Sequence, residues 1–446
     1  MLLTNLEHPM NNTTQDKIKA LVESISDDKN SLRYIYNSNK EFIPGTTPVY
    51  YSGPYWDNRE IEKALESFLT GKWLSSGESV NKFEVKFSKM FNIESSVMVN
   101  SGSSANLVMI AAIKKVLKWE DGSEIILSPV GFPTTIAPVV QANLEPVFVD
   151  IELDTLNFDL NLIEAKITDK TKAIFVSPVL GNPPDMDKLC EIAKKHNLEI
   201  IMDNCDSLGS KWRGKYLTDY AIAASCSFYP AHHISTGEGG MVSSNNPEIV
   251  NVARSLAWWG RDCYCVGSAN LLACGTCGNR FDKWLDEYDG IVDHKYIFTN
   301  MGYNLKPLDM QGAIGLIQLT KWEEIHTNRV NSKNKLQEII MKHLPEVHMP
   351  EELPNAETSW FGTPIVCKDK TQKDWLVGFL ESIKVQTRNY FAGNILLHPG
   401  YSHLDKYQNY PNSNKVLDRV FFIGASPHYT DEIFNYIDTE LTNEIL

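Results

Sequence analysis

The chain has 446 residues, of which 43% are hydrophobic and 22% charged, so it is long enough for a large core and a second, smaller domain. Its net charge of -14 argues against nucleic acid or an anionic membrane as a partner, because both require a basic surface, and any anionic ligand must be held by local groups. The first residues lack the basic start and apolar run of a signal peptide, and no later stretch reaches membrane-spanning length. We therefore expect a cytoplasmic protein whose eight cysteines are metal ligands or free thiols rather than disulfides.

The N-terminal residues 1–48 are polar, and we interpret them as an extension with one helix predicted at 15–26. Apolar residues recur at helical spacing over 58–69, and the Gly-bounded stretch 71–77 ends that helix. From spacing alone, 71–77 is either a helix-ending loop or part of a ligand site.

Short apolar strands are predicted at 124–127, 146–149, 173–176 and 198–202, and they alternate with helical patterns such as 186–195. This alternation is typical of βαβ units and predicts an α/β fold, with a mostly parallel sheet covered by helices on both faces. Ligands of such sheets bind at the carboxyl ends of the strands.

Two domains follow the N-terminal extension in this interpretation. The large one spans 49–322 and ends in a helix predicted at 311–322, which links it to the smaller one. Mixed strand and helix signals, divided by prolines, predict a small α+β domain at 323–446.

The stretch with the most chemical content is 227–240, which reads Ser-Phe-Tyr-Pro-Ala-His-His-Ile-Ser-Thr-Gly-Glu-Gly-Gly. It follows a small apolar strand, ends in a Gly-rich turn and presents His232 and His233 to a predicted pocket. The stretch resembles the cofactor-lysine signature SFxxxK…TTGEGG of the DegT/DnrJ/EryC1/StrS sugar aminotransferases. These enzymes act on nucleotide-linked keto sugars and are a branch of the fold-type I pyridoxal phosphate (PLP) enzymes, so the resemblance implies a seven-stranded sheet. His232 stands at the position of the family's lysine.

A histidine at this position changes the chemistry that the resemblance implies. A lysine amine condenses with the pyridoxal aldehyde to an internal Schiff base, whereas an imidazole cannot. A cofactor held here is therefore non-covalent, and pyridoxamine 5'-phosphate (PMP) fits, because its own amine can condense with a keto sugar. His232 is then free to act as a general base near neutral pH. A histidine packed in the core is the alternative.

Residues 100–106, Asn-Ser-Gly-Ser-Ser-Ala-Asn, join a strand predicted at 96–99 to a helix. A strand, a turn of small residues and a helix present free backbone N–H groups and the positive helix end to a phosphate. The segment resembles the family's phosphate cradle NSGTAAL. The implied phosphate contacts are Gly102, Ser103 and Ser104, with Ser227 as a further donor.

Five more residues match cofactor-facing positions of the family. Phe132 corresponds to the aromatic that stacks on the cofactor ring, and Asp203, at the end of the strand 198–202, to the carboxylate that keeps the pyridine nitrogen protonated. A buried core side chain and a helix N-cap are the respective alternatives. Asp206 and Tyr229 occupy positions where aminotransferases carry other residues, and we expect both to help separate dehydration from transamination. Phe391, in a loop resembling that of the 3-dehydrases, is a further cofactor contact or a plain hairpin residue.

Residues 300–315 resemble the family's GxNYRMxExQAAxG segment. In the family, the asparagine at the position of Asn304 reaches the cofactor phosphate of the neighbouring subunit, which implies a homodimer with shared active sites. Lys306 replaces the family's arginine nearby, which alters that contact.

Four cysteines suggest a metal site, because four thiolates can hold a 2Fe-2S cluster. Their spacing resembles the motif of the family's iron–sulfur 3-dehydrases, which act on CDP-4-keto-6-deoxyglucose. The implied ligands are Cys205, Cys263, Cys265 and Cys277, with Cys274 as the alternative to Cys277 because the gap after Cys265 is longer here. Tetrahedral zinc is the competing metal. The remaining cysteines have apolar neighbours and are predicted to be packed thiols: Cys190, Cys226 and Cys367.

The resemblance implies an enzyme that dehydrates a nucleotide-linked 4-keto-6-deoxyhexose at C3. PMP would condense with the C4 ketone, His232 would remove a proton and the C3 hydroxyl would leave. An NADH-dependent flavin and iron–sulfur reductase would supply electrons, and a 4-keto-3,6-dideoxy sugar would be released. The alternatives are an iron-free GDP- or TDP-sugar 3-dehydratase that uses glutamate, an ordinary aminotransferase, and a zinc-stabilised non-catalytic protein on the same fold.

Overall fold

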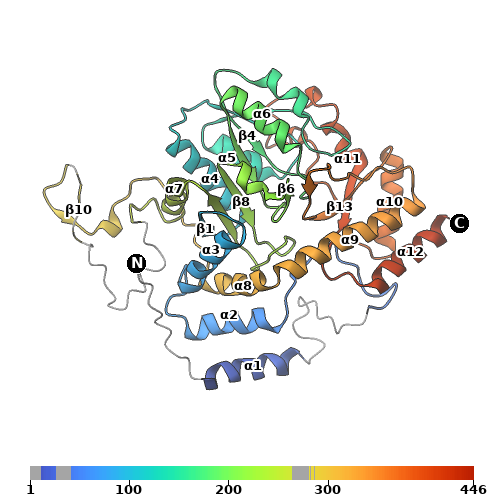
Figure 1. Ribbon diagram of the computed structural model, residues 1–446, viewed down its shortest axis with the longest axis horizontal. Coiled ribbons are helices and arrows are strands. Elements are labelled where there is room, and N and C mark those ends of the chain that lie inside the picture. The colour runs from blue at the N-terminus through green and yellow to red at the C-terminus, as the bar shows by residue number, and fades with distance from the viewer. Residues whose placement is uncertain (1–11, 27–41, 264–280, 282, 286, 446) are drawn as a thin grey trace.

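A computed structural model describes residues 12–26, 42–263, 281, 283–285 and 287–445. Its centre is a seven-stranded sheet in the order β1-β9-β8-β5-β4-β2-β3 (Figure 1). The strands are β1 (Ser95–Val99), β2 (Glu124–Leu127), β3 (Glu145–Phe148), β4 (Thr171–Val176), β5 (Glu199–Asp203), β8 (Ala223–Ser227) and β9 (Gly240–Ser244). Neighbours pair in parallel except at β9, which is antiparallel to β1 and β8. The predicted α/β fold with a mostly parallel seven-stranded sheet is confirmed.

Helices cover both faces of this sheet, because alternate strand residues are apolar on either side. One face packs against α4 (Gly102–Val116), α5 (Pro133–Gln141) and α7 (Pro247–Ala257). The other packs against α3 (Glu78–Met90) and α6 (Met186–His196). Local signals fix their ends: Asp185 caps the start of α6 with a hydrogen bond from the Lys188 amide, and Asn197 ends it in a left-handed conformation.

The N-terminal helix α1 (Asn12–Ser26) lies against α2 (Asn58–Thr70), below the body of the molecule in Figure 1. Asp57 and Glu60 form a capping box at the start of α2. Next to α2 lies α8 (Asp309–Thr320). The single helix predicted at 311–322 is wrong in its bounds, because α8 ends at Thr320 and α9 (Trp322–His343) begins directly afterwards.

The C-terminal part is a three-stranded antiparallel sheet, β13-β15-β14, with helices packed on it, which confirms a smaller α+β domain. Its elements are β13 (Gly362–Val366), α10 (Lys370–Ser382), β14 (Thr387–Asn389), α11 (Val416–Arg419), β15 (Val420–Gly424) and α12 (Asp431–Ile445). Its core contains Leu336 of α9, Leu376 of α10 and Phe421 of β15. Two minor sheets pair β12 (Ala356–Glu357) with β6 (Lys211–Trp212) and β7 (Lys215–Tyr216), and β10 (Lys283–Trp284) with β11 (Ile291–Val292).

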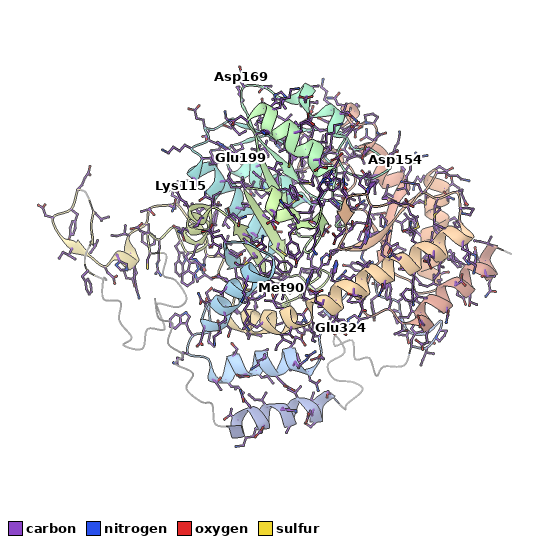
Figure 2. The ribbon with its side chains drawn as sticks, in the orientation of Figure 1. Met90, Lys115, Asp154, Asp169, Glu199 and Glu324 are labelled. Atoms are coloured by element: carbon purple, nitrogen blue, oxygen red, sulfur yellow. The ribbon has the colours of Figure 1, made fainter. Side chains whose placement is uncertain are left out.

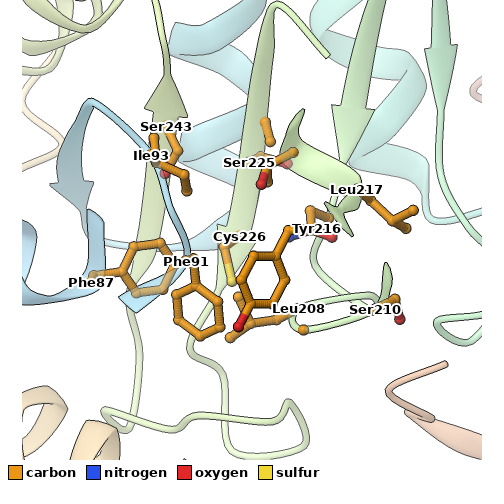
Figure 3. A pocket seen from close by; sticks show the side chains of 14 residues that line it. Phe87, Phe91, Ile93, Leu208, Ser210, Tyr216, Leu217, Ser225, Cys226 and Ser243 are labelled. Atoms are coloured by element: carbon orange, nitrogen blue, oxygen red, sulfur yellow. The ribbon is translucent and has the colours of Figure 1, made fainter. Parts of the chain in front are cut away.

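Behind β8, aromatic side chains form a closed cluster. Figure 3 shows Cys226 pointing from the strand toward Phe91 and Tyr216. The Phe228 ring, which is fully buried, lies 5.2 Å from Phe83. The space left here is about 10 Å³, which holds no ligand.

Charged side chains cover the outer faces, as Lys115, Asp169 and Glu324 illustrate (Figure 2). Among the described residues, no helix combines the length and the apolar character that crossing a membrane requires.

Candidate active site

A pocket of about 480 Å³ opens at the carboxyl ends of β5 and β8, where the loop after β14 approaches the large sheet. Its lining includes ten of the residues predicted from the sequence: Gly102, Ser103, Phe132, Asp203, Cys205, Asp206, Ser227, Tyr229, His232 and Phe391. Ser104 and Asn304 are described but do not line it. Residues from five sequence-distant segments thus meet at the edge of the sheet where ligands of parallel sheets bind.

Asp203 ends β5 on the floor of the pocket, with 5% of its surface exposed. Its Oδ2 accepts hydrogen bonds from Asn106 Nδ2 at 2.8 Å and Thr135 Oγ1 at 2.6 Å. Its Oδ1 accepts from the Cys205 amide at 3.2 Å and Ser225 Oγ at 3.3 Å. Four donors hold the carboxylate in one orientation, and no helix follows it, so the N-cap alternative is wrong.

The two neighbouring histidines take opposite environments. His232 faces the pocket with its Nδ1 3.5 Å from Oδ1 of Asp206. His233 is 2% exposed, and its Nε2 lies 2.9 Å from the Ser359 carbonyl oxygen. The expectation that both histidines reach the pocket is therefore wrong for His233, because the turn after Tyr229 sends successive side chains to opposite sides.

Burial determines the protonation states of His232 and Asp206 in the pocket. It lowers the pKa of His232 to about 4, and the cation of Arg329 acts in the same direction, while Asp203 and the backbone of Cys205 oppose it. Burial also raises the pKa of Asp206 to about 8, the charge of Asp203 adds to this and Arg329 opposes it. At pH 7 the two side chains are neutral, so their contact is not an ion pair and the imidazole has a free lone pair.

Arg329 of α9 holds the backbone that carries His232. The guanidinium is 1% exposed and donates to the carbonyl oxygens of Ala231 at 3.2 Å, His232 at 3.0 Å and Phe361 at 3.3 Å. Burial lowers the pKa of Arg329 to about 10, so it remains a cation at pH 7. The small domain thereby fixes the loop of the large domain that carries the imidazole.

The N-terminus of α4 supplies the predicted anion site. Ser101 caps the helix by accepting a hydrogen bond from the Ser104 amide at 3.1 Å, and the Ser104 hydroxyl, 3.0 Å from that of Ser101, does not line the pocket. A Cβ at Gly102 would lie 2.5 Å from the Cβ of Ser227, so only glycine leaves the helix end this close to Ser227. The Ser103 hydroxyl lies 2.9 Å from that of Thr134. Backbone N–H groups and three hydroxyls thus gather where a phosphate can bind.

Aromatic side chains form the mouth of the pocket. Phe132 and Tyr229 are 52% and 48% exposed, so Phe132 is not a core residue. The rings of Phe132 and Phe391 lie 6.0 Å apart at 88°. A flat ring system can enter between the mouth and Asp203.

Several lining residues were not predicted. Asn106 lies one helical turn after Gly102, and this spacing could have identified it. The sequence holds no comparable signal for Tyr51 and Arg388, which line the pocket, or for Arg329, which lies behind it and holds the His232 backbone.

Asn304 is exposed and lies away from the pocket of its own chain. Its Oδ1 accepts a hydrogen bond from Nζ of Lys306, which lies 3.4 Å from the centre of the Trp259 ring. Burial lowers the pKa of Lys306 to about 8, and Arg261 adds to this.

The predicted cluster ligands are only partly described. Cys205 lies behind the N-terminus of α4, and its Sγ is 3.9 Å from Ser225 Oγ. Burial and the charge of Asp203 raise the pKa of this thiol. Cys263 is half-buried, and Cys265, Cys274 and Cys277 lie outside the described residues. Within the described ranges, no three His, Cys, Asp or Glu side chains converge as a metal site would require.

The three cysteines outside the predicted cluster lie in the interior or at its edge. Cys226 and Cys367 are buried, as expected of packed thiols, and Cys190 is half-buried.

Comparisons with known proteins agree with this geometry. The DegT/DnrJ/EryC1/StrS aminotransferase family model matches residues 56–442. The chain is 38% identical over 405 residues to the dTDP-4-dehydro-2,6-dideoxy-D-glucose 3-dehydratase of Saccharopolyspora spinosa, which covers 89% of this chain and 86% of that protein. It is 37% identical over 411 residues to the lipopolysaccharide biosynthesis protein RfbH of Salmonella typhimurium, with 90% and 92% covered. The structure of Escherichia coli GDP-4-keto-6-deoxy-D-mannose-3-dehydratase with bound hydrated PLP matches with a TM-score of 0.76 and 28% identity, covering 88% of this chain and 99% of that one.

Proposed function

Because the chain belongs to the DegT/DnrJ/EryC1/StrS aminotransferase family, we propose that it is a PMP-dependent 3-dehydratase of a nucleotide-linked 4-keto-6-deoxyhexose. Relatives named as 3-dehydratases of dTDP- and GDP-linked sugars support this reaction class. The observation that carries the proposal is the side chain at the family's lysine position. His232 occupies it inside the pocket, and among the described lining residues there is no lysine to bind the cofactor covalently.

The residues present fit PMP. The helix end at Gly102, which a Cβ would block, and the hydroxyls of Ser103 and Ser227 would hold the phosphate. Asp203, fixed by four donors, would pair with the pyridine nitrogen, and Phe132 would cover one face of the ring. When bound, the cofactor supplies an amine for the ketone and a ring that withdraws electrons.

Each reactive side chain then has one task. A ring nitrogen of His232, neutral at pH 7, accepts the proton from the carbon that bears the cofactor amine. Asp206, protonated at pH 7, lies beside the imidazole, and its Oδ1, 3.5 Å from Nδ1, can accept a hydrogen bond from Nδ1–H, which leaves the lone pair on Nε2 for the proton. Tyr229 and Phe391 line the same space and exclude water from the reacting atoms.

The nucleotide and the source of electrons are finer proposals. Relatives that act on dTDP- and GDP-linked sugars support those nucleotides over the CDP that the iron–sulfur resemblance implied. We keep a 2Fe-2S cluster on Cys205, Cys263, Cys265 and Cys277, reduced by an NADH-dependent reductase, as a proposal. Its support is the cysteine spacing alone, and the mechanism derived above does not depend on it.

The family resemblance also supports a homodimer. In this proposal, Asn304 of one subunit contacts the cofactor phosphate of the other, since Asn304 is exposed and remote from its own pocket. Lys306, which binds Asn304, would set the position of that contact.

The proposal is tested with purified protein, PMP and the 4-keto-6-deoxyhexose linked in turn to CDP, dTDP and GDP, with glutamate or with NADH and a reductase in parallel reactions to supply the two electrons that the deoxygenation consumes. We expect PMP-dependent loss of the C3 hydroxyl, detected by mass spectrometry and NMR. An amino group at C4 with the C3 hydroxyl retained would instead establish an aminotransferase and overturn the proposal.

The iron-free alternative is separated by the electron source and by metal analysis. Turnover with glutamate and without iron would establish it, whereas turnover that requires NADH and a reductase supports the cluster. In the second case we expect Cys205→Ser to lose iron and Cys226→Ser, a buried thiol on the other face of the sheet, to retain it. Zinc without PMP binding would establish a non-catalytic protein.

A further inference from the structure

The pocket contains more anionic than cationic side chains. Its described lining includes the carboxylates of Asp203 and Glu238, besides Asp206, which is neutral at pH 7, but one arginine, Arg388, and no lysine. His232 does not compensate, because burial keeps it neutral at pH 7. The chain as a whole carries a net charge of -14, so it attracts anions only through local groups. A doubly charged ligand such as a nucleoside diphosphate therefore needs a specific cation at the pocket.

Arg388 is placed for this task by strand pairing. It is the middle residue of β14 and pairs with Phe422 of β15, which fixes its backbone. Its guanidinium lies 4.2 Å from the centre of the Tyr51 ring, and Nη1 donates to the Thr387 carbonyl oxygen at 2.7 Å. The phenol ring in turn packs edge-on against Phe422, with centroids 6.1 Å apart. The Tyr51 ring thus covers one flat face of the guanidinium, and N–H groups on its edge remain available to donate hydrogen bonds to a ligand.

None of the contacts of Arg388 neutralises it. Its partners are the Tyr51 side chain, whose ring it covers and whose hydroxyl it also contacts, and a backbone carbonyl, and no ion pair joins it to a carboxylate among the described residues. Elsewhere in the described chain, exposed arginines such as Arg213 pair with a carboxylate, here Asp187 at 2.7 Å. An exposed guanidinium with free N–H donors can bind phosphate oxygens through two parallel hydrogen bonds.

We propose that Arg388 binds the diphosphate of the substrate, stacked on Tyr51. The inference rests on the proposed function and adds a residue that selects for a nucleotide-linked sugar over a free sugar. The cofactor phosphate is a separate anion, because its predicted site is the N-terminus of α4 in the large domain. Close neighbours of Gly102 there are Ser227 and Cys205, and Arg388 comes from the small domain.

The test measures binding of CDP, GDP and dTDP to the PMP-loaded protein by calorimetry, with cytidine as the phosphate-free reference. For Arg388→Met we expect the affinity for each diphosphate to fall by about tenfold or more, as expected for the loss of charge-assisted hydrogen bonds, while cytidine binding stays the same. Arg388→Lys should recover part of the loss, because it retains the charge but not the paired donors.

Two controls sharpen the result. Arg213→Met removes an exposed arginine remote from the pocket and should leave all affinities unchanged. Tyr51→Phe keeps the stacking ring and removes only the hydroxyl contact with Arg388, so it should lose less affinity than Tyr51→Ala, which should reproduce part of the Arg388→Met loss.

Three outcomes would overturn the inference: undiminished diphosphate binding, an equal loss for cytidine, or an equal loss of PMP affinity, which would assign Arg388 to the cofactor. Since this assay involves no turnover, its failure is distinguishable from failure of the proposed reaction, which the product assay reports.

Discussion

The two sides of the segment 227–233 differ in what their polar atoms do. On the pocket side, the imidazole of His232 is half-buried, lies beside the carboxyl of Asp206, and both groups are neutral at pH 7. On the core side, His233 is bonded to the Ser359 carbonyl oxygen, and Phe228 is enclosed by aromatic rings. One short segment therefore anchors itself in the core through one set of residues and presents the other set to a ligand. The difference predicts that mutations on the two sides separate activity from stability.

The largest expected effect is on the pocket side. We expect His232→Asn to lower product formation by about 10³-fold, because a general base of this kind contributes roughly 10²- to 10⁴-fold. PMP affinity and the unfolding midpoint should change little, since His232 Nδ1 has no hydrogen-bond partner to lose. Single-turnover assays and calorimetry measure the two quantities. Product formation at the wild-type rate would remove His232 from the reaction.

The matching change on the core side is Phe87→Ala in the cluster behind β8, where Phe87 is 1% exposed and packs on Phe228. Deleting a buried ring should lower the free energy of unfolding by about 3–4 kcal/mol, measured by urea denaturation. The exposed Phe68→Ala is the control and should cost little. If Phe87→Ala abolished PMP binding in the folded protein, the two sides would not be independent.

A smaller effect concerns pH. Burial lowers the pKa of His233 well below its ordinary value of 6.5, so the neutral form is favoured in the fold. Below pH 6.5 the unfolded chain binds a proton at His233 and the folded chain does not. The free energy of unfolding is therefore at its full value above pH 6.5 and decreases below it, by up to about 1.4 kcal/mol per pH unit. We expect His233→Gln to flatten the dependence of the unfolding free energy on pH between 6.5 and 5. Equal slopes for the two proteins would show that His233 does not titrate in this way.

Much of the fold followed from local patterns. The strand predicted at 124–127 and the helix predicted at 186–195 match β2 and α6, because each is an apolar pattern bounded by turn or cap residues. The break between α8 and α9 was missed, since Lys321, which interrupts the helix, is an ordinary helix former. Its Nζ is buried between Glu60 and Asp57, and such a tertiary contact leaves no local pattern.

The residues of the candidate site also fall into those that the sequence predicted and those that it did not. Gly102 follows β1 by three residues and Asp203 ends β5, so the rule that ligands bind at strand ends favoured both positions, and the family resemblance supplied their predicted roles. Arg329 and Arg388 occupy a helix and a strand of the small domain; Arg329 lies in no recognisable motif, and the loop resemblance that includes Arg388 pointed to Phe391 rather than to the arginine. Their roles depend on the packing of one domain against the other, which no window of sequence contains.

The buried guanidinium of Arg329 also restricts how the two domains can move relative to each other. A rotation of α9 away from the large domain would break the hydrogen bonds from the Arg329 guanidinium to the carbonyl oxygens of Ala231 and His232 and leave only the one to Phe361, which lies beside β13. Hinge opening at that joint is therefore strongly disfavoured, and we expect ligands to enter past the half-exposed rings of Tyr229 and Phe132 while the two domains remain locked together.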